Sequence, residues 1–367
     1  MSLAQRVKPR VASLQPYQPG KPIEELEREL GIHNSLKLAS NENPLGPSPR
    51  ALEAVREALP RVHRYPDGAS FLLRRALSRR LDVPEDQLVF GCGSDELLEL
   101  VAKAFVGEGD EVVYAWPSFA MYPIVMRGAG ADPVEVPLDE QRVHDLEAMA
   151  GAVSERTQVV IVCNPNNPTG TSVGAEAFDR FVAGLPDDVV LVIDEAYVEY
   201  ARRADFPDAL AWIARRPATV VLRTFSKIYG LAGLRIGYGV AGAELAGYLE
   251  RARHPFNVNS LSEVAACAAL EDEEHVARAR RLNTEGLVYL ERELGELGLE
   301  TWPSDANFIL VRAGEEVYEP LLREGVIVRP MGGFGLADCV RVTVGLPEEN
   351  ERFVKALRRI RESGAAA

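Results

Sequence analysis

The chain has 367 residues, with 41 lysines and arginines against 55 aspartates and glutamates, so its formal net charge is −14 at pH 7. This length exceeds what one hydrophobic core usually organises, and two domains are expected. The 47% of hydrophobic and 26% of charged residues are typical of a folded globular protein and argue against disorder. The negative charge, with no dense basic patch to offset it, predicts no binding to nucleic acid or to a membrane surface.

The sequence carries no pattern typical of secretion, membrane insertion or metal binding. Its longest apolar runs, such as residues 159–163 and 189–193, are far shorter than the ~20 residues that cross a bilayer. The N-terminus lacks the apolar run and the cleavage site of a signal peptide. The 4 cysteines form no CxxC pair and the 5 histidines form no HExxH motif. We therefore expect a cytoplasmic protein with reduced thiols and no metal site.

Residues 1–48 are rich in proline and asparagine, which predicts an arm without long regular elements. After it, helices alternate with short valine-rich strands whose residues are apolar on both faces. This pattern predicts an α/β fold with a mostly parallel sheet covered by helices. The expected helices span residues 49–59 and 71–81 and one that starts at 94, and the expected strands span residues 88–90, 111–114, 159–162, 189–193, 219–222 and 235–240.

Beyond residue 240 the pattern changes to long amphipathic helices followed by strands and a last helix, which predicts a second, smaller α/β domain. We expect an N-terminal arm of residues 1–45 that joins the small domain, a large domain of residues 46–247 and a small domain of residues 248–367. The helices are expected at residues 241–253, 260–270, 273–297 and 348–361, and the strands at 308–311, 326–328 and 340–344.

The segment GCGSDELL places a turn of small residues, Gly91 to Ser94, directly before an apolar helix. Such a turn leaves N–H groups and the positive end of the helix dipole free for a phosphate. The alternative is a tight turn capped by Ser94 or Asp95. The segment is not GxGxxG, because Glu96 stands where the third glycine belongs, and it is not a Walker loop.

Two polar segments follow buried strands. NPNNPTG begins at Asn164, and DEAY spans Asp194 to Tyr197. The carboxyl ends of strands are where an α/β sheet holds its ligands, although a plain loop and a helix cap remain alternatives. An aspartate and a tyrosine placed in this way can bind a heteroaromatic ring, the carboxylate at a ring nitrogen and the hydroxyl at a phenolic oxygen.

Lys227 stands apart among the few lysines of the chain, because it lies between two strands and is surrounded by small residues in RTFSKIYGLAGLRIGYG. A desolvated lysine can lose its proton and attack a carbonyl to form a Schiff base. A plain surface loop would not explain why Thr224, Ser226 and Arg235, all suited to bind phosphate, flank it.

TFSKIYGLAGLRIGY resembles the lysine motif of the fold-type I pyridoxal-phosphate aminotransferases, and NPNNPTG and DEAY are similar to the two motifs that precede it in that family. Within the family, YQPGKP, KLASNENPLGPSP, RYPDG, GSDELL, SDANFIL, GVIVRPM and VRVTVG are similar to histidinol-phosphate aminotransferases. The resemblance covers nearly the whole chain. It implies a large cofactor-binding domain with a mostly parallel central sheet, a smaller α/β C-terminal domain, and a homodimer.

The resemblance implies that Lys227 attaches the cofactor, pyridoxal 5'-phosphate, and moves a proton to and from the substrate α-carbon. Asp194 would pair with the pyridine nitrogen and allow the ring to accept electrons. Asn167 and Tyr197 would bind the phenolic oxygen, and Phe119 would stack on the ring. The catalytic residues are then Lys227, Asp194 and Tyr197. The phosphate end is assigned to Gly93, Ser94, Asp95, Thr224, Ser226 and Arg235, with Tyr65 from the other subunit.

For the substrate, the resemblance implies that Arg329 and Arg341 bind an anionic group and that Tyr17, Asn43 and Asn307 line the cleft. The implied reaction converts L-histidinol phosphate and 2-oxoglutarate to imidazole-acetol phosphate and L-glutamate, in histidine biosynthesis. An aminotransferase for phenylalanine or tyrosine and a decarboxylase of the same fold with a phosphate substrate are the alternatives. A non-catalytic regulator would usually carry a fused DNA-binding domain, for which this chain has no room.

Overall fold

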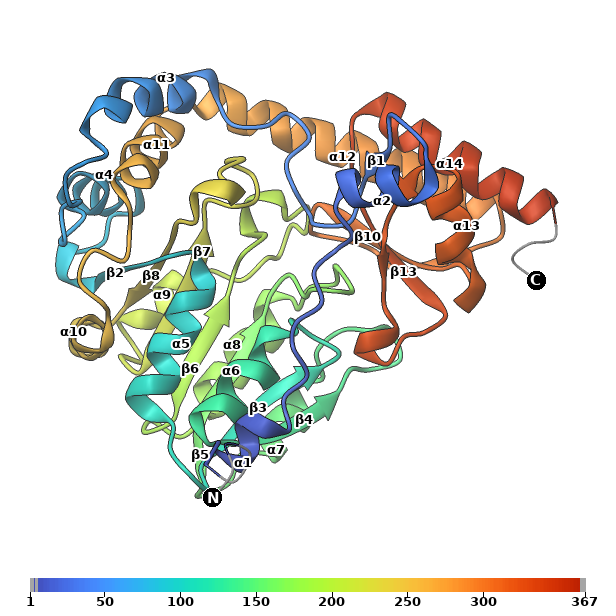
Figure 1. The fold of residues 1–367 in the computed structure, drawn as a ribbon. Coiled ribbons are helices and arrows are strands. Elements are labelled where there is room, and N and C mark those ends of the chain that lie inside the picture. The colour runs from blue at the N-terminus through green and yellow to red at the C-terminus, as the bar shows by residue number, and fades with distance from the viewer. Residues whose placement is uncertain (1–2, 4–5, 364–367) are drawn as a thin grey trace.

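A computed structural model describes residue 3 and residues 6–363 of the chain (Figure 1). The ends of the predicted arm and of the predicted C-terminal domain, residues 1–2, 4–5 and 364–367, lie outside the described part. The centre is a 7-stranded sheet in which neighbours from β7 to β4 run parallel, while β8 is antiparallel to β7 and β2. The predicted mostly parallel sheet is therefore confirmed. In spatial order the strands are β2 (Leu88–Gly91), β8 (Gly237–Ala241), β7 (Thr219–Thr224), β6 (Val190–Asp194), β5 (Thr157–Cys163), β3 (Glu111–Trp116) and β4 (Asp132–Pro137).

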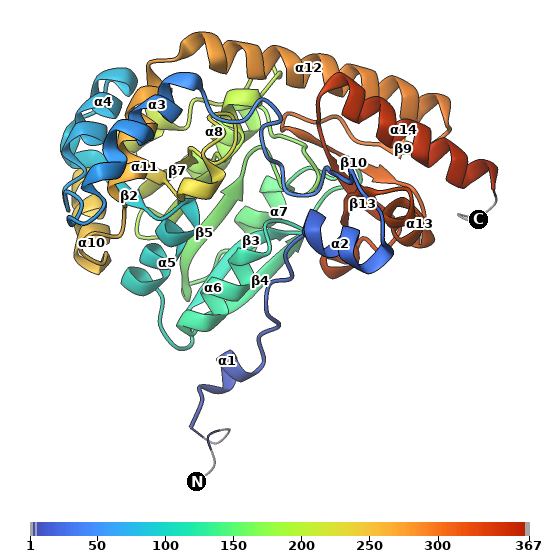
Figure 2. The same ribbon diagram turned by 45° about the horizontal axis from the view of Figure 1, so that its top comes forward.

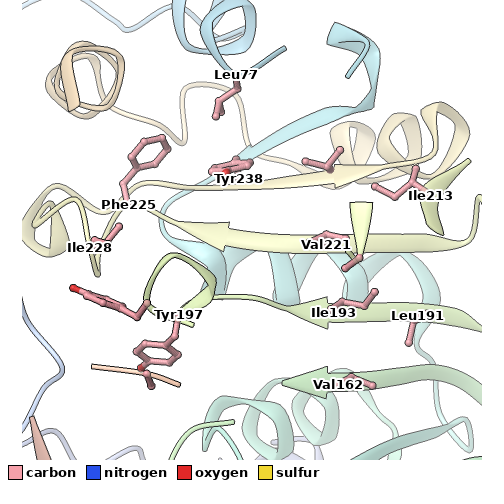
Figure 3. Close-up of a cluster of buried hydrophobic side chains, with 14 of the residues drawn as sticks. Leu77, Val162, Leu191, Ile193, Tyr197, Ile213, Val221, Phe225, Ile228 and Tyr238 are labelled. Carbon is pink, nitrogen blue, oxygen red and sulfur yellow. The ribbon is translucent and has the colours of Figure 1, made fainter. Parts of the chain in front are cut away.

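Both faces of this sheet are buried, because successive residues of each strand point to opposite sides. In β5, Val160 and Val162 belong to one core cluster, and Val159 and Ile161 belong to the other. Figure 3 shows side chains of the first cluster on neighbouring strands of the sheet. Helices α3 (Pro49–Ala58), α4 (Phe71–Leu81), α8 (Ala175–Gly184) and α11 (Ser260–Leu270) cover the first face, and α5 (Ser94–Phe105), α6 (Met121–Ala129) and α10 (Ala243–Ala252) cover the second.

A 4-stranded sheet forms the centre of a second core, against which α12 (Glu273–Glu296) and α14 (Pro347–Glu362) pack (Figure 2). The arm contributes β1 (Leu36–Lys37), which pairs in parallel with β11 (Val326–Ile327). This pairing supports the expectation that the arm joins the small domain. The 4-stranded sheet has the order β12 (Arg329–Pro330), β13 (Cys339–Thr343), β10 (Phe308–Arg312) and β9 (Glu300–Thr301).

Helix α12 connects the two cores. Its early residues Val276 and Ala279 pack in the core of the large sheet, together with Ala265 of α11, whereas Leu287 and Leu290 pack in the small core. The boundary between the large and the small domain, expected after residue 247, stays a prediction. The packing indicates that the chain passes from one core to the other inside α12.

Some short elements were not expected from the sequence. Strand β4 contains Pro133 and Pro137, which a strand tolerates only at the edge of a sheet, and β4 is an edge strand. The strand expected at residues 235–240 begins only at Gly237, because Arg235 adopts a left-handed conformation with φ of 58°.

None of the helices in the described part of the chain is long and apolar enough to span a membrane. The remaining helices are α1 (Pro9–Ala12), α2 (Ile23–Leu30), α7 (Leu146–Gly151), α9 (Leu210–Ile213) and α13 (Tyr318–Arg323).

Candidate active site

A cavity of about 260 Å³ lies where the strands β5, β6 and β7 end. The arm, the large domain and the small domain all contribute to its walls. The carboxyl edge of a parallel sheet is the usual ligand site of an α/β fold. The cavity is lined by Tyr17, Gly20, Ala39, Ser40, Asn41, Glu42, Gly93, Ser94, Asp95, Phe119, Cys163, Asn167, Asp194, Ala196, Tyr197, Thr224, Ser226, Lys227, Ala232, Arg235 and Arg341.

Asp194 is the last residue of β6, and its carboxylate is held at both oxygens. The Tyr122 hydroxyl donates to Oδ2 at 2.7 Å, and the Ala196 N–H donates to Oδ1 at 3.2 Å. Burial raises the pKa of Asp194 to about 6, against the lowering effect of the Tyr122 hydrogen bond. A positive group in the cavity would offset this cost of desolvation, so Asp194 is suited to pair with a protonated ring nitrogen.

Tyr197 and Asn167 both leave a hydrogen-bond donor free. Asn41 Nδ2 donates to the Tyr197 hydroxyl at 2.8 Å, so the hydroxyl proton is left to donate elsewhere. Arg341 donates to Asn167 Oδ1, and no partner for Asn167 Nδ2 is found among the described residues. Since both side chains line the cavity, they form a pair of donors for one acceptor oxygen.

Lys227 follows β7, and its amine lies 5.5 Å from the centre of the Tyr197 ring. We find no hydrogen bond or ion pair of its Nζ atom with any residue that the structure describes. Burial, followed by the positive charge of Arg341, lowers the pKa of Lys227 to about 8. A substantial fraction of the amine is therefore neutral near physiological pH, as a nucleophile or a general base must be.

The other end of the cavity is suited to a phosphate. Helix α5 begins at Ser94, and Arg235 lies beside its first turn with Nη2 at 3.5 Å from Asp95 Oδ2. Gly93 has a φ of +79°, and a Cβ there would lie 2.6 Å from Arg235 Nη2. Only glycine at this position leaves room for the guanidinium beside the helix N-terminus. The helix N–H groups, the Ser226 hydroxyl and the Arg235 guanidinium then provide three kinds of hydrogen-bond donor for a phosphate.

Arg341 on β13 brings a buried positive charge to the cavity. Its Nη2 donates to the Ala39 carbonyl at 2.9 Å, and its buried Nε has no partner in the described part of the chain. Burial lowers the pKa of Arg341. An unpartnered guanidinium N–H is costly in a protein interior, so the site is suited to an anionic group.

Four predicted site residues do not line the cavity. Asn43 donates to the Ile228 carbonyl at 2.8 Å, next to Lys227, and Asn307 donates to the Asn41 carbonyl at 3.0 Å. Both therefore support the backbone of residues around the cavity instead of reaching into it. The Arg329 guanidinium lies 5.3 Å from the ring centre of Tyr17, which does line the cavity. Tyr65 is 84% exposed and stacks on Phe256 with ring centres 5.0 Å apart.

Two residues that orient the site were missed in the sequence. Asn41, a neighbour of the predicted Asn43 in SNENP, positions the Tyr197 hydroxyl and also accepts from the Thr343 hydroxyl at 3.2 Å. Tyr122 ends the segment WPSFAMY, three residues after Phe119, and donates to Asp194. In the sequence, only their positions close to the predicted site residues Asn43 and Phe119 pointed to them.

The fold and the cavity are suited to an enzyme that uses a lysine and an anion-bearing ring cofactor. The sequence matches the family Aminotransferase class I and II over residues 33–357. The chain therefore belongs to this family, and the predicted fold-type I architecture is confirmed.

Two relatives and one solved structure similar to this chain carry the name of one branch of the family. It is 51% identical to histidinol-phosphate aminotransferase 1 of Nitrosococcus oceani, over 96% of each chain. It is 50% identical to histidinol-phosphate aminotransferase 2 of Pseudomonas aeruginosa, over 98% of each chain. Its structure is similar to histidinol-phosphate aminotransferase from Sinorhizobium meliloti in complex with pyridoxal-5'-phosphate, with a TM-score of 0.91, 30% identity and 98% of both chains covered.

Proposed function

We propose that this chain is a histidinol-phosphate aminotransferase, which uses pyridoxal 5'-phosphate to transfer an amino group from L-histidinol phosphate to 2-oxoglutarate, yielding imidazole-acetol phosphate and L-glutamate. One observation carries the proposal: a single cavity brings together Lys227, Asp194, a phosphate-binding helix start and the buried Arg341. The relatives that share about half of its residues over their whole length bear this name.

The residues of the cavity fit the cofactor. Gly93, Ser94, Thr224, Ser226 and Arg235 would bind its phosphate, with Asp95 beside the arginine. Asp194 would pair with its ring nitrogen, Asn167 and Tyr197 would donate to its phenolic oxygen, and Phe119 would stack on its ring. When bound, the cofactor supplies an electron sink for a carbanion at the substrate α-carbon.

Lys227 acts as the proton carrier of the reaction. Its Nζ atom lies in the cavity, and its lowered pKa of about 8 leaves a share of the amine free to take a proton from the substrate α-carbon. The nearby Arg341 charge favours the neutral amine, and Asp95 and Glu42 oppose this effect. The same nitrogen is the attachment point for the cofactor.

Arg341 binds the anionic end of the substrate, and the arm covers that end. Tyr17 lines the cavity, and Arg329 both lies over the Tyr17 ring and donates to the Gln18 carbonyl. The arm is thereby fastened to β12 at the substrate end. In this position the arm would exclude water from the carbanion, and Arg329, which lies over the cavity-lining Tyr17, would attract a phosphate or a carboxylate.

We also propose a homodimer in which Tyr65 reaches the phosphate of the partner's cofactor. Tyr65 is almost fully exposed and makes no contribution to the cavity of its own chain. The neighbouring segment exposes several large apolar side chains, as an interface would require. These are Leu59, Val62, Phe71 and Leu72, together with Phe256 under the Tyr65 ring.

The substrate assignment is tested by comparing amino donors with 2-oxoglutarate as acceptor. L-Histidinol phosphate should exceed phenylalanine and tyrosine in kcat/KM by at least roughly tenfold, which equals about 1.4 kcal/mol of differential transition-state binding. If phenylalanine matches or exceeds histidinol phosphate, the enzyme is an aromatic aminotransferase. Release of carbon dioxide from an amino acid that carries both a carboxylate and a phosphate, without a keto-acid acceptor, would indicate a decarboxylase instead.

The attachment point is tested separately by borohydride reduction of the purified protein and peptide mapping. The label should be found on Lys227, because no other lysine lines the cavity in the described part of the chain. Replacing Lys227 with Ala should abolish turnover but leave the ring and phosphate contacts able to hold some cofactor. A label on any other lysine would contradict the assignment.

A further inference from the structure

Tyr122 lies directly behind two residues assigned to the cofactor ring. It is fully buried near the start of α6, and its hydroxyl donates to Asp194 Oδ2 at 2.7 Å. Its ring meets the Phe119 ring edge to face, with centres 5.7 Å apart. One side chain therefore contacts both the residue expected at the ring nitrogen and the residue expected on the ring face.

The hydrogen bond from Tyr122 fixes how the Asp194 carboxylate is turned. The Ala196 N–H holds Oδ1 at the longer distance of 3.2 Å, so the two donors together prevent rotation of the carboxylate. Each carboxylate oxygen accepts more than one hydrogen bond, so both can still serve a ligand. Without the hydroxyl, only the weaker backbone contact would orient Asp194.

We propose that Tyr122 is a positioning residue for transamination, whose hydroxyl holds the Asp194 carboxylate toward the cofactor ring nitrogen and keeps the shared proton on that nitrogen. This inference rests on the proposed function, since it concerns the same cofactor. It adds a residue that does not line the cavity and acts through Asp194.

The direction of the effect follows from hydrogen-bond chemistry. A proton shared by a carboxylate and a ring nitrogen resides more on the stronger base. The Tyr122 hydroxyl donates to the carboxylate, which stabilises its charged form and weakens it as a base. Burial raises the pKa of Tyr122 well above its ordinary value, so the phenol itself keeps its proton. Removing the hydroxyl therefore shifts the shared proton toward Asp194 and weakens the ring as an electron sink.

The test is Tyr122→Phe, which keeps the ring that packs on Phe119 and removes only the hydroxyl. Tyr114→Phe is a matched control, because Tyr114 is also fully buried, lies next to Tyr122 with ring centres 6.0 Å apart, and donates to a different carboxylate, Glu135 Oε1, at 3.1 Å. The readout is the nitrogen-15 NMR signal of ring-labelled cofactor bound to each variant. Affinity is measured in parallel for pyridoxal phosphate and for its 1-deaza analogue, which has carbon in place of the ring nitrogen.

In Tyr122→Phe the nitrogen signal should move toward that of an unprotonated ring, and the dissociation constant of pyridoxal phosphate should rise by up to roughly tenfold, less than the effect of losing the charge-assisted contact of Asp194 itself. The affinity of Tyr122→Phe for the deaza analogue should stay as in the unmodified protein. In Tyr114→Phe the nitrogen signal and the affinity for pyridoxal phosphate should both stay unchanged. An unchanged signal and affinity in Tyr122→Phe, with both altered in Asp194→Asn, would overturn the role of Tyr122 and leave the proposed function intact. An unaltered signal in Asp194→Asn as well would remove the ring-nitrogen role of Asp194, and with it the inference.

A second measurement does not depend on bound cofactor or on the folding of Tyr122→Phe. In the cofactor-free protein, 3,5-difluorotyrosine at position 122 offers a phenol of nearly the same size that is a stronger donor. Carbon-13 NMR of the Asp194 carboxyl group should then show a lower titration midpoint than in the unmodified protein. An unchanged midpoint would overturn the proposal.

Discussion

Burial shifts the pKa of Lys227 down to about 8 and that of Asp194 up to about 6, so each of these two cavity side chains keeps its charge over a narrower pH range than usual. Each shift means that the charged form costs stability in the folded protein. For Lys227 this cost is fully present below pH 8 and disappears as the pH rises toward 10.5. For Asp194 it is absent below about pH 4 and fully present above pH 6. A cofactor with a positive ring nitrogen and an electrophilic carbon would relieve both costs.

The protonation of Lys227 predicts how cofactor capture depends on pH. Only the neutral amine attacks a carbonyl, so the rate of covalent attachment to the cofactor-free protein should rise with pH and level off above about pH 8. Stopped-flow absorbance after mixing with pyridoxal phosphate measures this rate. A rate that continues to rise up to pH 10.5 would indicate an amine with an ordinary pKa and would contradict the effect of burial.

Asp194→Asn separates the catalytic role of Asp194 from a structural one. Turnover should fall by at least tenfold to a hundredfold, because a neutral amide cannot stabilise a protonated ring and a lost charge-assisted contact costs about 1.5–3 kcal/mol. The cofactor-free variant should be at least as stable as the unmodified protein at pH 8, because the buried charge is gone, and the difference should shrink below pH 6. Denaturant unfolding at both pH values checks this. If Asp194 were only a helix cap, activity would be retained and stability would change little at either pH, because asparagine caps a helix about as well as aspartate.

At the scale of elements, the site is built where strands end and helices begin. Strand β6 ends at Asp194, β7 ends just before the segment that carries Ser226 and Lys227, and α5 starts at Ser94. Short apolar strands followed by small or polar residues made these three places visible in the sequence, and the structure brings all of them to one cavity. A local pattern was sufficient there because the sheet itself aligns the strand ends.

The contribution of the arm to the site could not be predicted from a local sequence pattern. Asn41 acquires its role through hydrogen bonds to Tyr197 and Thr343, which are 156 and 302 residues away in the chain. Nothing near Asn41 in the sequence specifies either partner. For the same reason Asn43 and Asn307 were expected in the cleft, although their amides are used to hold neighbouring backbone. Composition identifies a polar segment, and only the tertiary fold decides which of its side chains face the ligand.

Gly93→Ala tests the turn before α5. A Cβ at Gly93 would collide with the end of a flexible side chain, Arg235 Nη2 at 2.6 Å, so the guanidinium should be displaced from the phosphate end of the cavity. We expect the dissociation constant of pyridoxal phosphate to rise by roughly tenfold or more. Gly109→Ala is the control, because Gly109 also has a positive φ, of +88°, but has open space around its Cβ position. Each variant should lose roughly 1–3 kcal/mol of stability from backbone strain, because both glycines have a positive φ and Gly93, with ψ of 169°, adopts a conformation that other residues rarely occupy. Equal cofactor affinity in the two variants would contradict the phosphate role of this turn.

At the scale of the whole molecule, the cavity depends on segments from both cores. The arm brings Tyr17 and Asn41, the large domain brings Asp194 and Lys227, and the small domain brings Arg341. Helix α12 packs in both cores and ties them together. Any movement of the small domain therefore changes the position of Arg341 and, through the Asn41 link to Thr343, the surroundings of the Tyr197 hydroxyl.

The exposed face around Tyr65 predicts that two chains share their active sites. Single variants Tyr65→Ala and Lys227→Ala should each have low activity, the first from weak cofactor binding and the second from the missing amine. After the two inactive proteins are unfolded together and refolded, half of the dimers should be hybrids, and one of the two sites in each hybrid combines an intact Lys227 with the partner subunit's intact Tyr65.

The mixture should therefore recover up to about a quarter of the unmodified activity, since random pairing makes about half of the dimers hybrid and half of their sites complete. Each variant refolded alone serves as the control and should recover only its own low activity. Sedimentation of the same samples reports the oligomeric state, which should be a dimer throughout. A monomer with full activity, or a mixture no more active than the average of its two components, would show that each chain completes its own site, and Tyr65 would then have no role at the cofactor phosphate.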